Sequence, residues 1–309
     1  MATNKKAASG HLKANRRALP VKPARSYEEQ LVRLSAMHGL IIEDDKRARS
    51  ILSNVNYYRL TTYGKHLRRE DDPERFVDGV SLETLYALYC FDMGLRHQVL
   101  PVLEFFEVQL RAKIAYQLAM AHGSLGYMDE ANFRPERFVN GSLVHKNLIG
   151  KFHQEVRRQG ELPFVRHHKT KYGGQFPIWV AVELFTFGML SSLYDIMLER
   201  DQRAVSGDYS LSPEALSRLI RCAVEVRNIC AHYNRLYNQP LDEQPLLLAH
   251  QKLYESDRVF PLLLALRGAI GRERVYQDMV SGIARLIEDY PQADPALCGF
   301  PAGWQQLLD

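Results

Sequence analysis

The 309-residue sequence is poor in several features that mark common classes of protein. Glycine, at 19 residues, and proline, at 14, are too few for a collagen-like or low-complexity chain. The longest apolar runs, such as residues 260–266, are far shorter than the roughly 20 residues that a membrane-spanning helix needs. The basic first residues are not followed by the apolar stretch of a secretory signal. We therefore expect a soluble, globular protein with no membrane partner.

Cysteine and the common catalytic motifs are also scarce. The cysteines are Cys90, Cys222, Cys230 and Cys298. None belongs to a CxxC pair, which disfavours a zinc ribbon or a thioredoxin-like site and favours the reducing cytoplasm as the location. The sequence contains no GxGxxG, Walker A, HExxH or GxSxG motif. The histidine pair at residues 167–168 has no carboxylate or cysteine at metal-ligand spacing. We expect neither a cofactor nor a metal.

Positive charge is concentrated in the first 25 residues. This segment holds seven basic side chains and no acidic one, and the rest of the chain has 33 basic against 36 acidic residues. A basic arm of this kind can contact the phosphate backbone of a nucleic acid. The alternative is a solvated, disordered terminus with no specific role.

Hydrophobic periodicity predicts a mostly helical chain without the alternating pattern of a Rossmann core, and therefore an all-α fold. Ser81 is the expected N-cap of a long helix that continues to about His122. Pro101 would either kink this helix or restart it. The sequence Ser-Pro-Glu at residues 212–214 marks the start of another clear helix, with a cap followed by proline at the first helical position.

The remaining elements have weaker boundary signals. We expect further helices over residues 26–37, 43–52, 143–158, 176–200, 246–268 and 272–290. Residues 54–67 are rich in aromatic side chains and threonine, and their propensity is that of a β-strand.

Two charged pairs with i,i+4 spacing lie in the long helix: Asp92 with Arg96, and Glu107 with Arg111. At about 100° per residue the four side chains fall on one side of the helix, interleaved with apolar positions. Charges are seldom buried without partners, so this pattern favours a partly buried ionic network that supports a site. The alternative is two ordinary surface pairs, each stabilising by about 0.3–0.5 kcal/mol.

The most informative segment is EVRNICAHYNRLYN, residues 225–238. Arg227 lies on an otherwise apolar helical stripe with Leu216, Ile220, Ala223, Cys230 and Ala231. An arginine there must find an anion, a carboxylate or a subunit interface. His232 is about 140° further around an ideal helix, so the two side chains converge only if the helix ends or bends, or a second subunit contributes. In the structural alternative, Arg227 pairs with Asp92 or Glu107, and His232 complements the helix dipole.

The sequence Arg-Asn-x-Cys-Ala-His at residues 227–232, followed by Asn234, Arg235 and Asn238, resembles the R-x4–6-H signature of HEPN domains. More narrowly, the chain resembles the Abi-like (AbiD/AbiF-type) family of bacterial abortive-infection proteins over roughly residues 27–240. The segments that agree with this family are NYYRL (56–60), LYCFDMGLR (88–96), EFFEVQLR (104–111) and ELFTFGMLSSLY (183–194). Many members have a second histidine where this chain has Tyr233.

The resemblance implies an HEPN-like helical bundle with an N-terminal helical module and additional C-terminal helices. The expected parts are a basic disordered tail (1–25), the N-terminal helical module (26–78), the HEPN-like core (79–245) with a basic insertion around residues 123–175, and the C-terminal helices (246–309).

The resemblance also implies action on RNA in anti-phage defence, as a metal-independent endoribonuclease with Arg227, Asn228 and His232 as catalytic residues. RNA carries its own nucleophile, the 2′-OH. His232 would move a proton, Arg227 would stabilise the charge developing on phosphorus, and Asn228 would hold a nearby phosphate or backbone group. One histidine per chain supplies only one of the acid and base roles at a time, which favours a homodimer.

Two alternatives stay open for this function. The protein could bind RNA, such as a structured small non-coding RNA, without cleaving it, or be a helical scaffold that recognises a phage protein. A basic stretch over residues 146–172 supports RNA binding, with Phe152, Phe164 and Tyr172 offering rings for stacking. The expected RNA-binding residues are Arg235, Asn238, Lys151, Arg157, Arg158, Arg166, Lys169 and Lys171.

Overall fold

The computed structural model describes residues 21, 23–138 and 141–308, and the regular structure within these ranges is helical. Extended segments there meet only in isolated bridges, so the all-α prediction is confirmed. The predicted basic tail lies outside the described residues except for residues 21 and 23–25. The α-helices are α1 (Tyr27–Val32), α2 (Asp45–Asn54), α3 (Tyr57–Tyr63), α4 (Leu82–His122), α5 (Val144–Arg158), α6 (Pro163–Lys171), α7 (Ile178–Ala181), α8 (Phe187–Ile196), α9 (Glu199–Gly207), α10 (Pro213–Ala231), α11 (Phe260–Ile270), α12 (Arg274–Asp289) and α13 (Trp304–Leu308).

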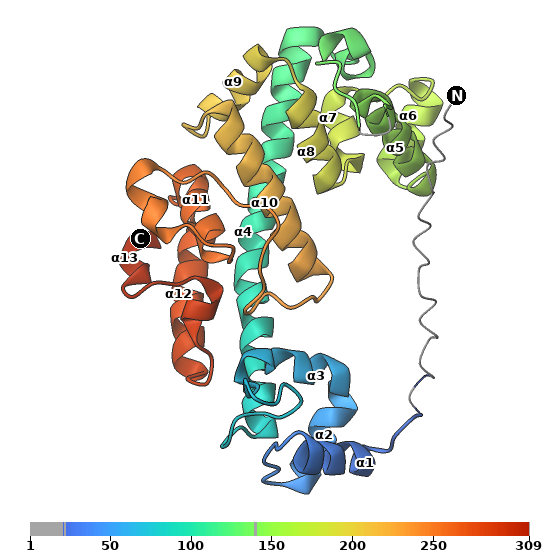
Figure 1. The fold of residues 1–309 in the computed structure, drawn as a ribbon. Helices are drawn as coiled ribbons and strands as arrows, with labels where there is room; N and C mark the ends of the chain where they lie inside the picture. The colour runs from blue at the N-terminus through green and yellow to red at the C-terminus, as the bar shows by residue number, and fades with distance from the viewer. Residues whose placement is uncertain (1–20, 22, 139–140, 309) are drawn as a thin grey trace, which may run out of the picture.

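Helix α4 has 41 residues and runs from the N-terminal helices to the group formed by α5–α9 (Figure 1). It begins as predicted, because the Ser81 hydroxyl accepts a hydrogen bond of 3.1 Å from the backbone N–H of Thr84. It ends before Gly123, whose φ of 79° suits a residue without a Cβ atom. Pro101 lies on the exposed side and the helix continues through it, so no restart occurs.

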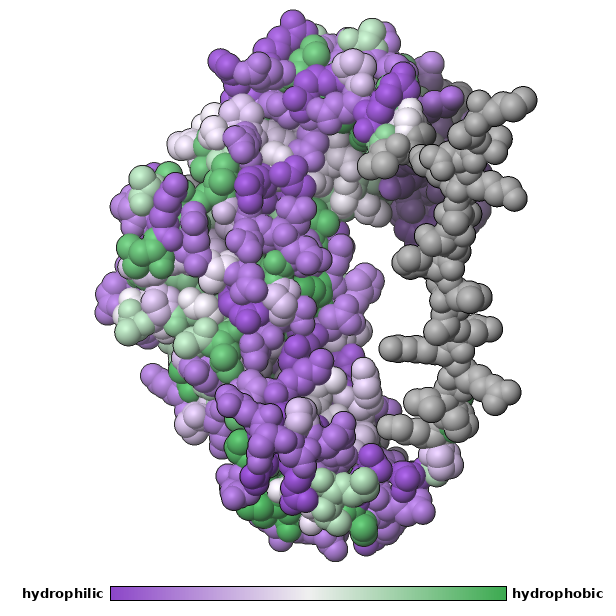
Figure 2. Space-filling model, in the orientation of Figure 1, coloured by the Kyte–Doolittle hydropathy of each residue, from purple (hydrophilic) through white to green (hydrophobic). Residues whose placement is uncertain are grey.

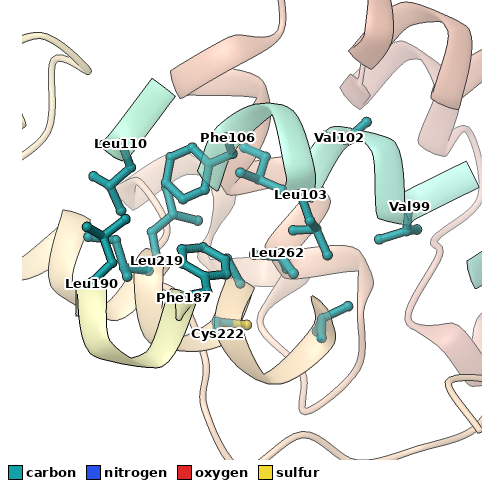
Figure 3. Packing of buried hydrophobic residues seen from close by; sticks show 14 of the residues in the cluster. Val99, Val102, Leu103, Phe106, Leu110, Phe187, Leu190, Leu219, Cys222 and Leu262 are labelled. Atoms are coloured by element: carbon teal, nitrogen blue, oxygen red, sulfur yellow. The ribbon is translucent and has the colours of Figure 1, made fainter. Parts of the chain in front are cut away.

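The main hydrophobic core lies where α8, α10 and α12 pack against α4, and α11 packs against α10. Figure 3 shows Phe106 and Leu110 of α4 lying opposite Phe187 and Leu190 of α8, with Leu219 of α10 beside them. All five side chains are buried. Burial of a side chain of this size stabilises the fold by about 1.5–3 kcal/mol, so this packing fixes the position of α10 against α4.

A smaller core holds the N-terminal helices together. It contains Leu60 of α3 and Phe76 of the following loop, and the first turn of α4 contributes Leu82 and Leu85. The first turn of α4 therefore packs with the N-terminal helices, although it follows the predicted boundary at residue 78. The domain boundaries as a whole stay predictions.

Residues 54–67 are not a strand, contrary to the prediction from propensity. The side chain of Asn56 caps α3 by accepting a hydrogen bond of 2.8 Å from the backbone N–H of Tyr58. Leu60 and Tyr63, three residues apart, are both buried. Tertiary packing of one helical face has overridden the β-propensity of the segment.

Residues 176–200 form several short helices and not the predicted single one. Helix α7 continues into a 3-10 turn at Val182–Leu184, and Phe185 then has extended dihedral angles. Thr186 starts α8, since its hydroxyl accepts a hydrogen bond of 3.2 Å from the backbone N–H of Met189. The break occurs because an internal threonine serves as an N-cap.

Other boundaries were predicted with mixed success. Helix α5 agrees with the prediction over 143–158, and α12 agrees with that over 272–290. Helix α6 was not predicted, although Pro163 at its first position was an available signal. The predicted helix over 246–268 is wrong: a 3-10 helix at Ala249–Tyr254 is separated from α11, which begins beside Pro261.

The surface in the view of Figure 2 is mainly hydrophilic, with hydrophobic residues in separate patches. Among the described residues, no helix combines the length and the apolar character needed to cross a bilayer. Helix α4 is long, but charged residues such as Asp92, Arg96 and Glu107 interrupt its apolar side.

Candidate functional site at the end of α10

Helix α10 carries the candidate site because its ends and its buried face are well defined. Its N-terminus is capped by Ser212, whose hydroxyl accepts a hydrogen bond of 3.1 Å from Ala215 N–H, and Pro213 occupies the first position. Its apolar face packs on α4 and α8. Arg227 lies at the edge of this face, with its side chain 22% exposed.

The guanidinium of Arg227 is held by a carboxylate of its own chain. Its Nη2 lies 3.1 Å from Oε2 of Glu107, and its Nε donates to the same oxygen at 3.2 Å. Its Nη1 donates to Oδ1 of Asn228 at 3.0 Å, and its Cζ lies 5.4 Å from the centre of the Phe187 ring. These contacts fix the guanidinium at the α4–α10 interface.

Glu107 is shared by two arginines. Its Oε1 accepts a hydrogen bond from Nη2 of Arg111, whose Nη1 donates to the carbonyl oxygen of Val182. The side chains of Glu107 and Arg111 are each 13% exposed. Two guanidiniums and one carboxylate leave this half-buried cluster with one net positive charge, which favours an anionic ligand at its exposed edge.

Helix α10 ends at Ala231, with His232 as its C-cap, in a Schellman-type turn. The backbone N–H of Tyr233 donates to Cys230 O, and that of Asn234 donates to Ile229 O, at 3.2 and 2.9 Å. Tyr233 has a φ of 57°, a left-handed conformation in which glycine is the usual residue. Nη1 of Arg59 in α3 donates to the carbonyl oxygen of Tyr233 at 2.6 Å. The turn is therefore held by the N-terminal helices.

The side chain of His232 is exposed, and within the described residues it has no hydrogen-bond or ionic partner. Because α10 is helical through Ala231, Arg227 and His232 remain on different sides of the helix, about 140° apart in an ideal helix. Only the C-cap geometry of His232 departs from that arrangement. An exposed imidazole at a helix end is accessible to a ligand.

Asp92 organises the segment that follows α10. Its Oδ1 accepts hydrogen bonds from the backbone N–H groups of Leu236 and Tyr237 at 2.8 and 2.7 Å. Its Oδ2 accepts from the hydroxyl of Tyr63 at 2.7 Å and from Nε of Arg96 at 3.1 Å. Burial, reinforced by the negative charge of Asp92, raises the pKa of Tyr63, so this hydroxyl stays protonated and donates.

The residues expected to form one ionic network lie in two clusters. Asp92 and Arg96 are buried beside the segment after α10, whereas Glu107 and Arg111 lie with Arg227. Both i,i+4 pairs are present, and both also contact other elements.

Arg235 and Asn238, two of the expected RNA-binding residues, are partly buried. Nη1 of Arg235 donates to the carbonyl oxygen of Thr62 at 2.9 Å, which ties the segment to α3. Asn238 has a φ of 50°, a conformation that asparagine tolerates better than most residues. Arg59 makes the corresponding contact from α3 and lies in the NYYRL segment, but nothing in the sequence marks it as part of the site.

The basic residues of the insertion lie on α5 and α6, apart from the end of α10 in the sequence. The exposed ones are Lys151, Arg157, Arg158, Arg166, Lys169 and Lys171. Arg158 is paired with Glu155 at 2.6 Å. Phe152 is 1% exposed and belongs to the core, so its predicted role in base stacking is wrong, whereas Tyr172 is 48% exposed.

Comparison with known proteins supports one assignment. The family model described as Abi-like protein matches residues 50–238, which is more than half of the chain and includes both ionic clusters and the end of α10. No curated protein and no solved structure matches the sequence. The chain belongs to the Abi-like protein family.

Proposed function

We propose that this Abi-like protein binds RNA through an HEPN-like core and cleaves it without a metal, using Arg227 and His232. Membership of the Abi-like family suggests a role in abortive-infection defence. The observation that carries the proposal is the pairing of a fixed, half-buried guanidinium with an exposed, unengaged imidazole at the end of one helix. That combination supplies one group for charge and another for proton transfer.

The chemistry assigns a role to each residue. His232 removes the proton of the 2′-OH or protonates the 5′-oxygen that leaves. Arg227, held by Glu107, stabilises the negative charge that develops on the phosphoryl oxygens. Asn228 orients Arg227 through its Oδ1, because it accepts a hydrogen bond from Nη1. The expected products carry a 2′,3′-cyclic phosphate and a 5′-hydroxyl.

The alternative function is binding of a small non-coding RNA without cleavage. One observation favours it: Arg227 already has a carboxylate, an amide and an aromatic partner within the chain, which is also what a purely structural arginine requires. In this case the basic residues of α5 and α6 would carry most of the phosphate contacts.

The test is cleavage of a labelled single-stranded RNA in the presence of EDTA. The native protein should produce cyclic-phosphate ends, and a substrate with 2′-deoxyribose at every position should stay intact. His232→Ala and Arg227→Ala should each lose at least a hundredfold in rate, whereas the matched control His250→Ala, an exposed histidine of the C-terminal region, should not. Undiminished cleavage by a folded His232→Ala variant would remove His232 from the site.

A further inference from the structure

A groove of about 520 Å³ lies between α6 and the segment that leads into α7, both at the upper right of Figure 1. Its walls include His167 and Tyr172 from α6 and its C-cap, Gln175 from the following loop, and Trp179 from α7. Trp179 is 54% exposed and Tyr172 is 48% exposed. Large rings seldom remain exposed together unless they serve a binding surface.

Several rings of the groove contact one another. The imidazole of His168 stacks on Phe176, with centres 5.3 Å apart and planes at 19°, and its Nδ1–H donates to the carbonyl oxygen of Phe164 at 2.8 Å. Tyr172 contacts His168 at 5.2 Å between ring centres. Ile178 N–H donates to Ser124 O at 2.8 Å, which anchors the backbone next to Trp179. The groove therefore presents an aromatic surface that is already organised.

The charge around the groove suits an anionic chain. None of the described residues that line it carries a carboxylate. Arg166, Lys169 and Lys171 are exposed on α6, and none of them forms an ion pair within the described part of the chain. Aromatic faces next to cations that have no carboxylate partner are the combination by which proteins bind single-stranded nucleic acid, with bases stacking on the rings and phosphates near the cations.

We propose that this groove receives an unpaired nucleobase of the bound RNA, stacked on Trp179 and Tyr172, while Lys169 and Lys171 contact the adjoining phosphates. The amide of Gln175 offers a donor and an acceptor to the edge of the base. The inference rests on the proposed RNA binding and adds that the RNA is recognised here as a single strand. A base within a duplex cannot present its face to the rings.

The chain offers a direct optical test, because its other tryptophan, Trp304, is buried against Phe300. The protein is titrated with an unpaired oligoribonucleotide of about ten nucleotides and with a blunt duplex of the same length. The single strand should quench the emission of Trp179, and the duplex should quench it much less. In Trp179→Phe the quenching should disappear.

Affinity measured by filter binding provides the second readout. Trp179→Ala should weaken binding of the single strand about 10- to 100-fold, whereas the control Tyr116→Ala, an exposed aromatic residue on α4 outside the groove, should leave it unchanged. RNA that binds without quenching Trp179, or a duplex that quenches equally, would overturn the groove assignment and leave the proposed RNA binding standing. Absence of RNA binding in both assays would overturn the two together.

Discussion

Arg227 of α10 and Glu107 of α4 form an ion pair within one chain, with Nη2 and Nε of the arginine at 3.1 and 3.2 Å from the same carboxylate oxygen. The pair explains how an arginine is tolerated at the edge of an apolar stripe, since a carboxylate of its own chain lies within ion-pair distance. It also aligns the guanidinium before any ligand arrives, which is a condition for stabilising a developing charge.

The pair should be measurable in a double-mutant cycle. Glu107→Gln should lower the free energy of unfolding by about 1–3 kcal/mol, and by more than Arg227→Gln, because Glu107 holds two arginines and Arg227 only one carboxylate. Urea denaturation of the two single variants and the double variant gives the coupling energy. The exposed pair of Arg203 with Glu199 is the control and should show almost no coupling. Equal, additive losses at Glu107 and Arg227 would contradict the shared cluster.

Asp92→Asn should destabilise the protein strongly, by about 3 kcal/mol. The carboxylate is buried and accepts four hydrogen bonds. In Asp92→Asn the side-chain NH2 group would replace one carboxylate oxygen and would face N–H or O–H donors that it cannot accept from. Tyr63→Phe removes one of the four donors and should cost only about 1 kcal/mol. Thermal or denaturant unfolding compares the two variants. A milder effect from Asp92→Asn than from Tyr63→Phe would show that Asp92 does not organise the segment after α10.

The starts of α4 and α10 are predictable from sequence, because they depend on local chemistry. Ser81 and the Ser212-Pro213 pair supply caps and a favourable first position, and both helices begin where expected. Local propensity predicts a strand at residues 54–67, but the helix there depends on the burial of Leu60 and Tyr63 against neighbours that are distant in sequence.

The residues of the candidate site could be predicted from the sequence, but the side chains that they contact could not. The sequence identified Arg227 as a charge that needs a counter-ion, and left Asp92 and Glu107 as equal alternatives. The choice depends on how α10 packs along α4, which places Arg227 beside Glu107 and leaves Asp92 for the segment beyond the helix. The contact of Arg59 with Tyr233 spans 174 positions and carries no local signal.

The basic surface of α5 and α6 should determine the salt dependence of RNA binding. Each phosphate that a charge-reversal variant no longer neutralises should reduce the slope of log K against log salt by about 0.7 to 0.9. Arg157→Glu and Lys169→Glu should have larger effects than Arg158→Glu, since Arg158 already pairs with Glu155. Binding titrations at several salt concentrations test this, and unchanged slopes would mean that these residues are only solvated.

The cysteine of the Arg-Asn-x-Cys-Ala-His segment should be chemically inert in the folded protein. Burial raises the pKa of Cys230 to about 12 and that of Cys298 to about 12, and it also raises the pKa of Cys222. A raised pKa means less thiolate at mildly alkaline pH and therefore slower reaction with a disulfide reagent. Burial raises the pKa of Cys90 as well, but this thiol is partly exposed and should react before the other three. Rapid modification of Cys230 in the native state would be incompatible with its buried position.

The last prediction is that the protein forms a homodimer. The ion pair of Arg227 with Glu107 changes the reason for expecting one. An uncompensated charge no longer requires a second chain, so the argument for a homodimer now rests on the separation of Arg227 and His232 around α10, which a residue from a partner chain would bridge. Light scattering on nuclease-treated protein should give twice the chain mass of 35.6 kDa.

Complementation tests whether the two chains build a composite site. If Arg227 of one chain acts with His232 of the other, each mixed dimer of Arg227→Ala and His232→Ala contains one intact pair. Random exchange of subunits makes half of the dimers mixed, so the mixture should recover about a quarter of the native cleavage rate, although each variant alone is inactive. Two inactive variants that remain inactive after exchange would place both residues of a site in one chain. A monomeric mass at all concentrations would favour RNA binding without cleavage.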